Sequence, residues 1–491
     1  MDLGQRAMEK IGSQVKSFLQ RADSTALLVN HHSSCPPIKK QAPEKEECYN
    51  IVLYDDEGLR KMESEKPRVA DPKGLKRTFR ALNHRNYRLF FGGQGISLIG
   101  TWMQLIAMSW LVYHLTNSAF LLGVVGFSGQ ICSFFFSPFA GVFSDRWNRH
   151  RILVATQTFS MIQAFILAFL TLTHTITVHH IIILSVFLGL VNAFDMPTRQ
   201  AFVVEMVEER EDLGNAIALN SFLFNGARLV GPSIAGILIS ILGEGLCFLL
   251  NGISFFAVII ALLAMKMKPS KKEPGKTQII KGLKEGFTYG YGFVPIRSIL
   301  LLLSWTSLVG MASTTLMPVF ARDILHGTSQ TFGFLMAASG MGAAIGAIYL
   351  ASRKSVIGLL GIIARASGVF GLGLIVFSFS HSLWFSLLLL LLIGFGMMVQ
   401  MASSNIVLQT IVDDTKRGRV MSLYTMSFLM GPFGSLLGGS LASKIGAPHT
   451  IIIGGASCLL GSLLFIKKLP SLRGMIRPIY VQKGILSEGP K

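Results

Sequence analysis

The amino-acid sequence predicts an all-α membrane protein whose twelve transmembrane helices form two similar six-helix halves. Hydrophobic residues make up 51% of the chain and charged residues only 14%, whereas soluble domains carry about 25% charged residues. Acidic and basic residues are absent from three long runs, which are Leu89–Ser144, Ile152–Phe194 and Ala366–Val412. Each run is long enough for two crossings of about 20 residues. Helices that are apolar on all sides at this length indicate a lipid environment.

The apolar segments place the expected helices in order along the chain. They lie near 88–114, 119–142, 152–173, 178–200, 215–241, 245–265, 298–320, 331–352, 362–380, 383–406, 419–441 and 448–467. The lysine-rich gap at 266–297 contains Pro269 and Pro274 and is interpreted as a cytoplasmic linker. The expected domains are an N-terminal extension (1–77), a first bundle (78–265), the linker (266–297), a second bundle (298–467) and a basic cytoplasmic tail (468–491).

Polar termini and short basic gaps exclude several other classes. The first 75 residues contain no apolar stretch of signal-peptide length, and their prolines and mixed charges favour a largely disordered cytoplasmic extension. An amphipathic helix on the membrane surface near residues 8–19 is the alternative. The net charge of +19 lies in short gaps between apolar runs, so no nucleic-acid partner is expected. The five cysteines show no metal spacing, and neither a metal nor another cofactor is expected.

The distribution of basic residues predicts the orientation. The gaps on one side contain most of the internal Lys and Arg residues, whereas the other side contains only Arg322 and Lys444. Because basic loops stay in the cytoplasm, both termini and the linker are expected there, in a multi-pass cytoplasmic membrane protein. A weak internal repeat agrees with two halves: Val203–Glu209 with Gly231-Pro232 recurs about 200 residues later as Leu408–Asp414 with Gly431-Pro432.

Two motifs carry a resemblance to a known family. The loop after the second helix reads Gly141-Val-Phe-Ser-Asp145-Arg146-Trp-Asn148-Arg149-His-Arg151, and it resembles the signature of the major facilitator superfamily with Asn148 in place of a glycine. Asn192–Ala201 followed by Ala227–Pro232 resembles the enterobactin-exporter-like, transmembrane secretion effector subfamily. The resemblance covers about residues 78–467. It implies secondary active export of a siderophore or drug-like solute, coupled to protons.

The resemblance also implies roles in gating. Asp145 suits the N-terminus of a neighbouring helix, and Arg146, Arg149 and Arg151 suit acids such as those at Glu208–Asp212. These contacts would form a latch in the outward-facing state; the alternative is that they only set the topology. Close packing through small residues is expected at Gly231, Pro232 and Gly236, with an outer gate as the further role that the resemblance implies.

Charged residues inside a span are costly, by roughly 2.5–3.5 kcal/mol on insertion scales, and are therefore functional candidates. Arg228 lies deep in the fifth helix, and Asp195 and Arg199 lie in the fourth. Because Asn192, Asp195 and Arg199 share a helical face, as do Asn225 and Arg228, the two faces could meet. Arg228 would then pair with Asp195 as a gate, or hold an anionic part of the solute. Asp195 is the first candidate for proton coupling and Glu205 the second.

Polar stripes mark two further helices. Gln94, Thr101 and Gln104 are spaced by three and four residues in the first helix, and Gln400 and Asn405 lie in the tenth. Solute contacts and hydrogen bonds between helices explain these stripes equally well. Trp305 in the seventh helix would stack on an aromatic solute or pack at the membrane interface.

The sequence therefore predicts a monomeric carrier whose partners are a small-molecule solute, protons and membrane lipid. Nutrient or siderophore uptake is the nearest alternative, because the fold and motifs would hardly change with direction. A lysophospholipid flippase is a second alternative. An integral membrane enzyme is not expected, because the chain lacks HExxH, GxSxG, P-loop and paired Cys-x-x-Cys motifs.

Overall fold

A computed structural model describes residues 27–29, 51–53, 79–207, 209–266, 288–353 and 355–486. The chain divides into two units, Met1–Thr78 and Phe79–Lys491. In the first unit, β1 (Leu27–Val29) pairs antiparallel with β2 (Ile51–Leu53). The amphipathic helix considered for residues 8–19 and most of the linker at 266–297 lie outside the described residues.

The first half of the second unit contains six long helices. After the short helix η1 (Arg80–Asn83), they are α4 (Arg85–Thr116), α5 (Ala119–Arg146), α6 (Arg149–Leu172), α7 (Val178–Met206), α8 (Leu213–Leu242) and α9 (Glu244–Leu263), with the short η2 (Arg210–Asp212) before α8. Turns between them carry defined caps. The hydroxyl of Ser118 accepts a hydrogen bond from the Leu121 amide at the start of α5, for example.

The second half repeats this arrangement with more interruptions. Its elements are α11 (Val294–Thr315), α12 (Met317–Val319), the π-helical turn η3 (Phe320–Ile324), α13 (Ser329–Ala351), α14 (Leu359–Ser378), α15 (Leu383–Ile411), α16 (Asp414–Phe428), α17 (Gly431–Ile445) and α18 (Ala447–Gln482). Twelve spans are long and apolar enough to cross a membrane within the described residues, which confirms the predicted fold class. The eleventh span is divided between α16 and α17, just before Pro432, whose ring cannot donate a helical hydrogen bond.

The last helix continues beyond the span expected at 448–467. It runs to Gln482, so most of the segment expected as a tail from residue 468 is helical. Leu472, Ile476 and Tyr480 recur every four residues on α18 and are buried in the core of the second half. The ammonium of Lys483 then donates hydrogen bonds to the carbonyls of Thr410 (2.8 Å) and Val412 (3.2 Å) at the end of α15.

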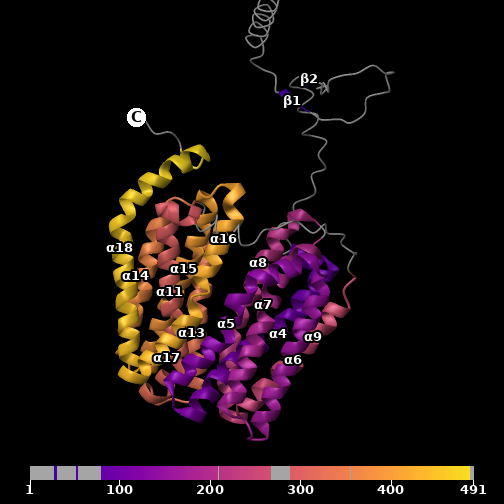
Figure 1. The fold of residues 1–491 in the computed structure, drawn as a ribbon, viewed down its shortest axis with the longest axis vertical. Coiled ribbons are helices and arrows are strands. Elements are labelled where there is room, and N and C mark those ends of the chain that lie inside the picture. The colour runs from indigo at the N-terminus through magenta and orange to yellow at the C-terminus, as the bar shows by residue number, and fades with distance from the viewer. Residues whose placement is uncertain are drawn as a thin grey trace, which may run out of the picture. The chain divides into compact units, whose positions relative to one another are not determined.

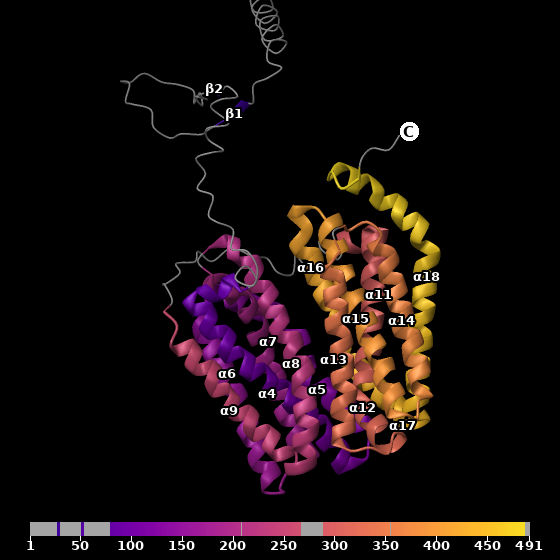
Figure 2. The same cartoon turned by 180° about the vertical axis from the view of Figure 1, so that it is seen from behind.

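The two halves converge at one end and diverge at the other (Figures 1 and 2). We call the converging end, which carries the turns at Asn117, Gly243, Gly327 and Gly446, the closed end. The opposite end, which carries η1 and the end of α18, is the divergent end. Two helix crossings join the halves, α8 with α13 and α5 with α17.

Candidate functional site

Glycines allow the two crossings between the halves. A Cβ atom on Gly236 would lie 2.8 Å from the carbonyl oxygen of Ser329 and 3.0 Å from the Cα of Gly333. A Cβ on Gly439 would lie 2.8 Å from the Cα of Gly123 in the same way. The helix backbones are therefore in direct contact at both crossings. The sequence had indicated Gly236 as a packing position but not its partners.

A group of polar side chains joins the halves beside these crossings. The Tyr113 hydroxyl donates a hydrogen bond to Asp323, and the guanidinium of Arg322 donates to Asn117 Oδ1 at 2.6 Å. The guanidinium carbon of Arg322 also lies 5.8 Å from the centre of the Tyr113 ring. We call Tyr113, Asn117, Arg322 and Asp323 the polar clamp. Because α4 belongs to the first half and η3 to the second, these contacts must break if the closed end opens.

Arg228 lies on α8 where this helix crosses α13. A Cβ on Gly340 of α13 would lie 3.0 Å from the Arg228 carbonyl oxygen. The side chain turns to α4, where its guanidinium carbon lies 5.8 Å from the centre of the Trp102 ring. Gly231 packs against the same tryptophan, because its Cβ would lie 2.6 Å from that of Trp102, and Pro232 is buried next to it.

The expected pairing of Arg228 with Asp195 is not formed. Within the described residues Arg228 has no ion-pair partner, and Asp195 pairs with Arg199 one turn along α7. The Asp195 carboxylate also accepts hydrogen bonds from Thr156 Oγ1 (2.9 Å) and Gln157 Nε2 (2.7 Å) of α6. It is 2% exposed. The physical reason is that α7 packs on α5 and α6, whereas α8 packs on α4 and α13, so the two faces do not meet.

The polar residues of α4 divide between the bundle interior and its surface. Gln104 donates a hydrogen bond to Gln163 Oε1 of α6 (2.9 Å) and accepts one from Asn251 Nδ2 of α9 (2.8 Å). Hydrogen bonding between helices is therefore the interpretation that the geometry supports for Gln104. Gln94 is also buried. Thr101 is exposed, and its hydroxyl donates to the Ser97 carbonyl of its own helix.

The remaining polar candidates of the spans lie apart from these groups. Asn192 is exposed on α7, and the Asn225 amide of α8 donates to the Ser221 carbonyl at 2.8 Å. On α15, Gln400 is buried and its Nε2 has no hydrogen-bond partner within the described residues. Asn405 accepts a hydrogen bond from Gln409 at 2.6 Å.

A pocket of about 420 Å³ lies near the divergent end of the second half. Asn405 lines it together with Gln409 and Thr410 of α15 and Arg417 of α16. Amides, a hydroxyl and a guanidinium are groups that bind a polar or anionic solute. Trp305 does not line this pocket, and its indole donates to Ser457 Oγ of α18 at 3.0 Å.

The signature loop is described in part. Gly141, Asp145 and Arg146 belong to α5, but their side chains lie outside the described residues. Asn148, which replaces the family glycine, caps α6 by accepting a hydrogen bond from the Arg151 amide at 3.2 Å. The Arg149 guanidinium pairs with Glu205 of α7 at 2.8 Å. This pair lies within the first half.

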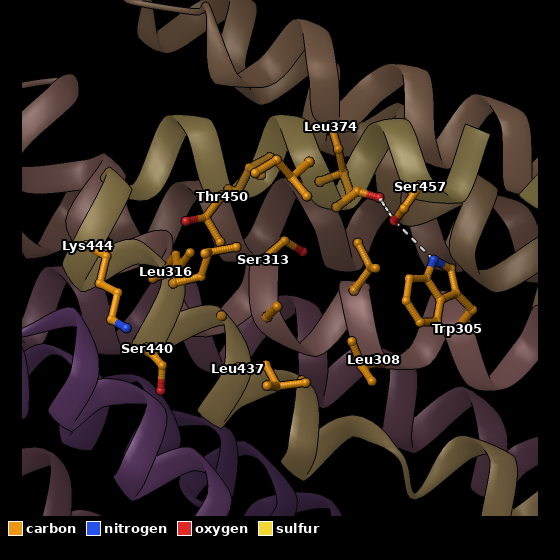
Figure 3. A pocket seen from close by; sticks show the side chains of 18 residues that line it. Trp305, Leu308, Ser313, Leu316, Leu374, Leu437, Ser440, Lys444, Thr450 and Ser457 are labelled. Carbon is orange, nitrogen blue, oxygen red and sulfur yellow. Dashed lines mark hydrogen bonds between the residues drawn. The ribbon is translucent and has the colours of Figure 1, made fainter. Parts of the chain in front are cut away.

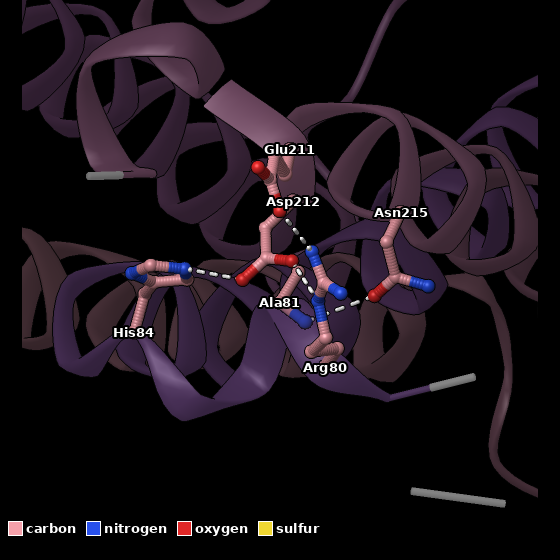
Figure 4. Close-up of polar contacts among 6 residues, drawn as sticks. All are labelled: Arg80, Ala81, His84, Glu211, Asp212 and Asn215. Carbon is pink, nitrogen blue, oxygen red and sulfur yellow. Dashed lines mark hydrogen bonds and ion pairs between the residues drawn. The ribbon is translucent and has the colours of Figure 1, made fainter. Parts of the chain in front are cut away.

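An ion cluster that the sequence analysis missed anchors the start of the first bundle (Figure 4). Asp212 accepts a hydrogen bond from the Arg80 guanidinium and lies 2.9 Å from His84 Nε2. The Ala81 amide donates to Asn215 Oδ1 at 2.9 Å. The only sequence signal for this cluster was the presence of basic residues before α4 and acidic residues before α8. No helical periodicity shows that these two segments lie side by side.

The Asp212 cluster predicts a pH-dependent contribution to stability. Burial alone would raise the pKa of Asp212, but hydrogen bonds from His84 and Arg80 and their charges outweigh it and lower the pKa below 3.8. A carboxyl group whose pKa is lowered by folding stabilises the folded state at pH values above its ordinary pKa. This contribution disappears as the pH falls through the lowered pKa. We expect Asp212→Asn to unfold at a lower temperature than the unchanged chain at pH 6. The difference should shrink as the pH falls below about 4 and should vanish only once the pH lies below the lowered pKa of Asp212. Thermal unfolding in detergent across this range measures it, and an unchanged difference at low pH would contradict the assignment.

Comparisons with known proteins agree with this architecture. The sequence model of the transmembrane secretion effector family matches residues 76–475. The chain is 27% identical to the staphyloferrin A transporter of Staphylococcus aureus, over 77% of this chain and 95% of that protein. It is 24% identical to the multidrug efflux pump Tap of Mycolicibacterium fortuitum, over 76% of this chain and 93% of that protein.

Solved structures show the same fold at low sequence identity. The crystal structure of a peptide transporter superposes with a TM-score of 0.64 at 12% identity, over 80% of this chain and 95% of that one. A bacterial homologue of the iron transporter ferroportin, solved in an inward-facing state, superposes with a TM-score of 0.60 at 17% identity, over 79% of this chain and 98% of that one. The chain belongs to the transmembrane secretion effector family of the major facilitator superfamily, and it is a membrane transporter and not an enzyme.

Proposed function

We propose that this transporter exports a small organic solute of the siderophore or drug-like type from the cytoplasm by alternating access. The observation that carries the proposal is the sealed closed end, where the glycine crossings and the polar clamp join the halves. At the divergent end, the pairs Arg149–Glu205 and Arg80–Asp212 each join elements of the first half. Opening the closed end would therefore require breaking a defined set of contacts.

The divergent end faces the cytoplasm in this proposal. It carries η1, the helix ends on either side of the linker and the end of α18. In the sequence, basic residues collect in these parts and in the linker. With both termini in the cytoplasm, the structure represents a state that receives solute from inside the cell. The opposite state would be latched by the signature loop through Gly141, Asp145, Arg146, Arg149 and Arg151.

Export of an organic solute is favoured over uptake by the family and its relatives. The family consists of secretion effectors, and a relative of 22% identity, covering 76% of this chain and 94% of its own length, is macrolide efflux protein A of Streptococcus pyogenes. In our proposal the pocket at Asn405 and Arg417 holds the polar part of the solute. Arg228, which has no acidic partner within the described residues, holds a second anionic group or the aromatic part through Trp102.

Proton coupling is assigned to Asp195 in this proposal. Its carboxylate is buried and holds Arg199, Thr156 and Gln157 at the junction of α6 and α7. Protonation would remove the charge that holds Arg199 and would allow α7 to move relative to α6. Glu205 is the second candidate, because it pairs with Arg149 nearer the divergent end.

Membrane vesicles of defined orientation test the proposal. Inside-out vesicles that are acidified inside should accumulate staphyloferrin A or a macrolide, and a protonophore should abolish the accumulation. Vesicles from cells that lack the protein provide the control. Accumulation only in right-side-out vesicles would replace export by uptake, and accumulation that is insensitive to the protonophore would remove proton coupling.

The position of Arg228 gives a specific prediction. We expect Arg228→Ala to reduce transport at least tenfold, because the variant loses both the cation over Trp102 and a group that can hold an anionic solute. Arg228→Lys keeps the charge but not the planar group, and it should retain partial activity. Transport in vesicles, normalised to the amount of inserted protein, measures the effect. Unchanged transport by the alanine variant would exclude Arg228 from the mechanism.

A further inference from the structure

A groove of about 400 Å³ runs along the second half between α17 and α18, with α11 as its floor. Most of its lining residues are apolar, and Leu437 and Ile453 on its two walls are 57% and 52% exposed. Exposed apolar side chains of a spanning bundle face lipid. Gly438 and Gly454 also line the groove, so the walls lack large side chains at these positions.

Most polar groups of the groove lie toward its ends, and the Ser313 hydroxyl between them donates to the Gly310 carbonyl of its own helix at 2.8 Å (Figure 3). Lys444 and Ser440 lie at one end, next to the last turn of α17 at the closed end, and Trp305 lies at the other. From Gly434 to Lys444 the helix rises by about 15 Å, which is half of a hydrocarbon core of about 30 Å. The groove therefore extends from the membrane surface to about the midplane, which is the depth of one leaflet.

The mouth of the groove carries one positive charge. Lys444 is exposed and forms no ion pair within the described part of the chain. The neighbouring hydroxyls of Ser440 and Thr450 donate to carbonyls of their own helices, at 2.7 Å and 2.9 Å. The ammonium of Lys444 is thus the group at this end that can bind an anion arriving at the membrane surface.

We propose that the groove holds one acyl chain of an anionic phospholipid in the leaflet at the closed end. The lipid phosphate lies at the Lys444 ammonium, and the chain extends along the apolar walls toward Trp305. The shape is open along its length, which suits a flexible chain, and the single cation at the surface selects an anionic headgroup. This site is separate from the solute pocket at Asn405, and it does not depend on the direction of solute transport.

Fluorescence quenching of Trp305 by brominated lipids tests the site. The full chain is prepared with Trp305 as its only tryptophan, by replacing Trp102, Trp110, Trp147 and Trp384 with phenylalanine, and is reconstituted with phosphatidylglycerol or phosphatidylcholine brominated on the acyl chains. We expect phosphatidylglycerol to bind beside Trp305 about fivefold more tightly than phosphatidylcholine. Lys444→Gln should reduce this preference to about one. Lys468→Gln, which removes an exposed lysine in the second half of α18, outside the groove, should leave it unchanged.

A second single-tryptophan chain controls for bulk lipid. Trp384 lies at the start of α15 at the closed end, outside the groove, and is 81% exposed. Both lipids should quench it equally. Native mass spectrometry of the chain with all its tryptophans avoids the phenylalanine replacements, and it should show one retained phosphatidylglycerol that Lys444→Gln loses. Equal quenching of Trp305 by both lipids, a preference that survives Lys444→Gln, or absence of quenching would each overturn the proposal.

Discussion

Gly236→Leu is expected to favour the state in which the closed end is open and to reduce transport about tenfold. The new side chain would begin 2.8 Å from the Ser329 carbonyl oxygen and 3.0 Å from the Gly333 Cα. Both neighbours are backbone atoms and cannot rotate away, so α8 and α13 must separate. Overpacking of this kind costs about 1–3 kcal/mol. Because the cost applies only to the state in which the halves touch, it shifts the population toward the opposite state by about tenfold.

Cysteine labelling measures this shift independently of transport. A reporter at Ser329→Cys, in a chain without its five native cysteines, is buried at the crossing and should react slowly with a membrane-impermeant maleimide. Gly236→Leu should speed the reaction about tenfold. Gly226→Leu on the same helix is the matched control, because a Cβ there meets nothing within 4 Å. Equal labelling of the two variants would show that the glycine crossing does not hold the halves together.

Much of the fold could be predicted because lipid imposes a simple requirement on the sequence. A spanning helix must be apolar over about 20 residues. Uncharged runs such as Leu89–Ser144 meet this requirement and are visible in the sequence. The continuation of α18 to Gln482 was missed. That segment is amphipathic and lies against the end of the bundle, with Leu472 and Ile476 buried. From sequence alone, a basic amphipathic segment is equally consistent with a cytoplasmic tail.

The candidate site was harder to predict, because one sequence alone does not show which helices contact one another. Gly236 was recognised from its own helix, but Gly333 lies about a hundred residues away and no pattern links the two. The polar stripe of α4 posed a related problem. A polar group within the membrane can find hydrogen-bond partners either along a solute pathway or on a neighbouring helix. Only the contacts of Gln104 with Gln163 and Asn251 distinguish these two possibilities.

Asp195→Ala is expected to be the most destabilising single change in the first half. It removes one member of a buried ion pair and leaves Arg199 without its partner, while Thr156 and Gln157 lose their acceptor. Breaking a buried pair in this way costs about 3–5 kcal/mol. The double variant Asp195→Ala, Arg199→Ala should be more stable than the sum of the single changes predicts, because no buried charge remains. Thermal unfolding of the four proteins in detergent measures this coupling.

Asp195→Asn separates a structural role from proton coupling. Asparagine keeps an oxygen that can accept from Thr156 or Gln157 but removes the charge that pairs with Arg199, so this variant should unfold at a temperature between those of the alanine variant and the unchanged chain. It cannot take up and release a proton, so accumulation driven by a pH gradient should be lost, while exchange of solute at equal pH continues. Glu205→Gln on the same helix is the matched control. If Asp195→Asn accumulates solute normally and Glu205→Gln does not, the coupling group is Glu205, and Asp195 serves to hold α6 and α7 together.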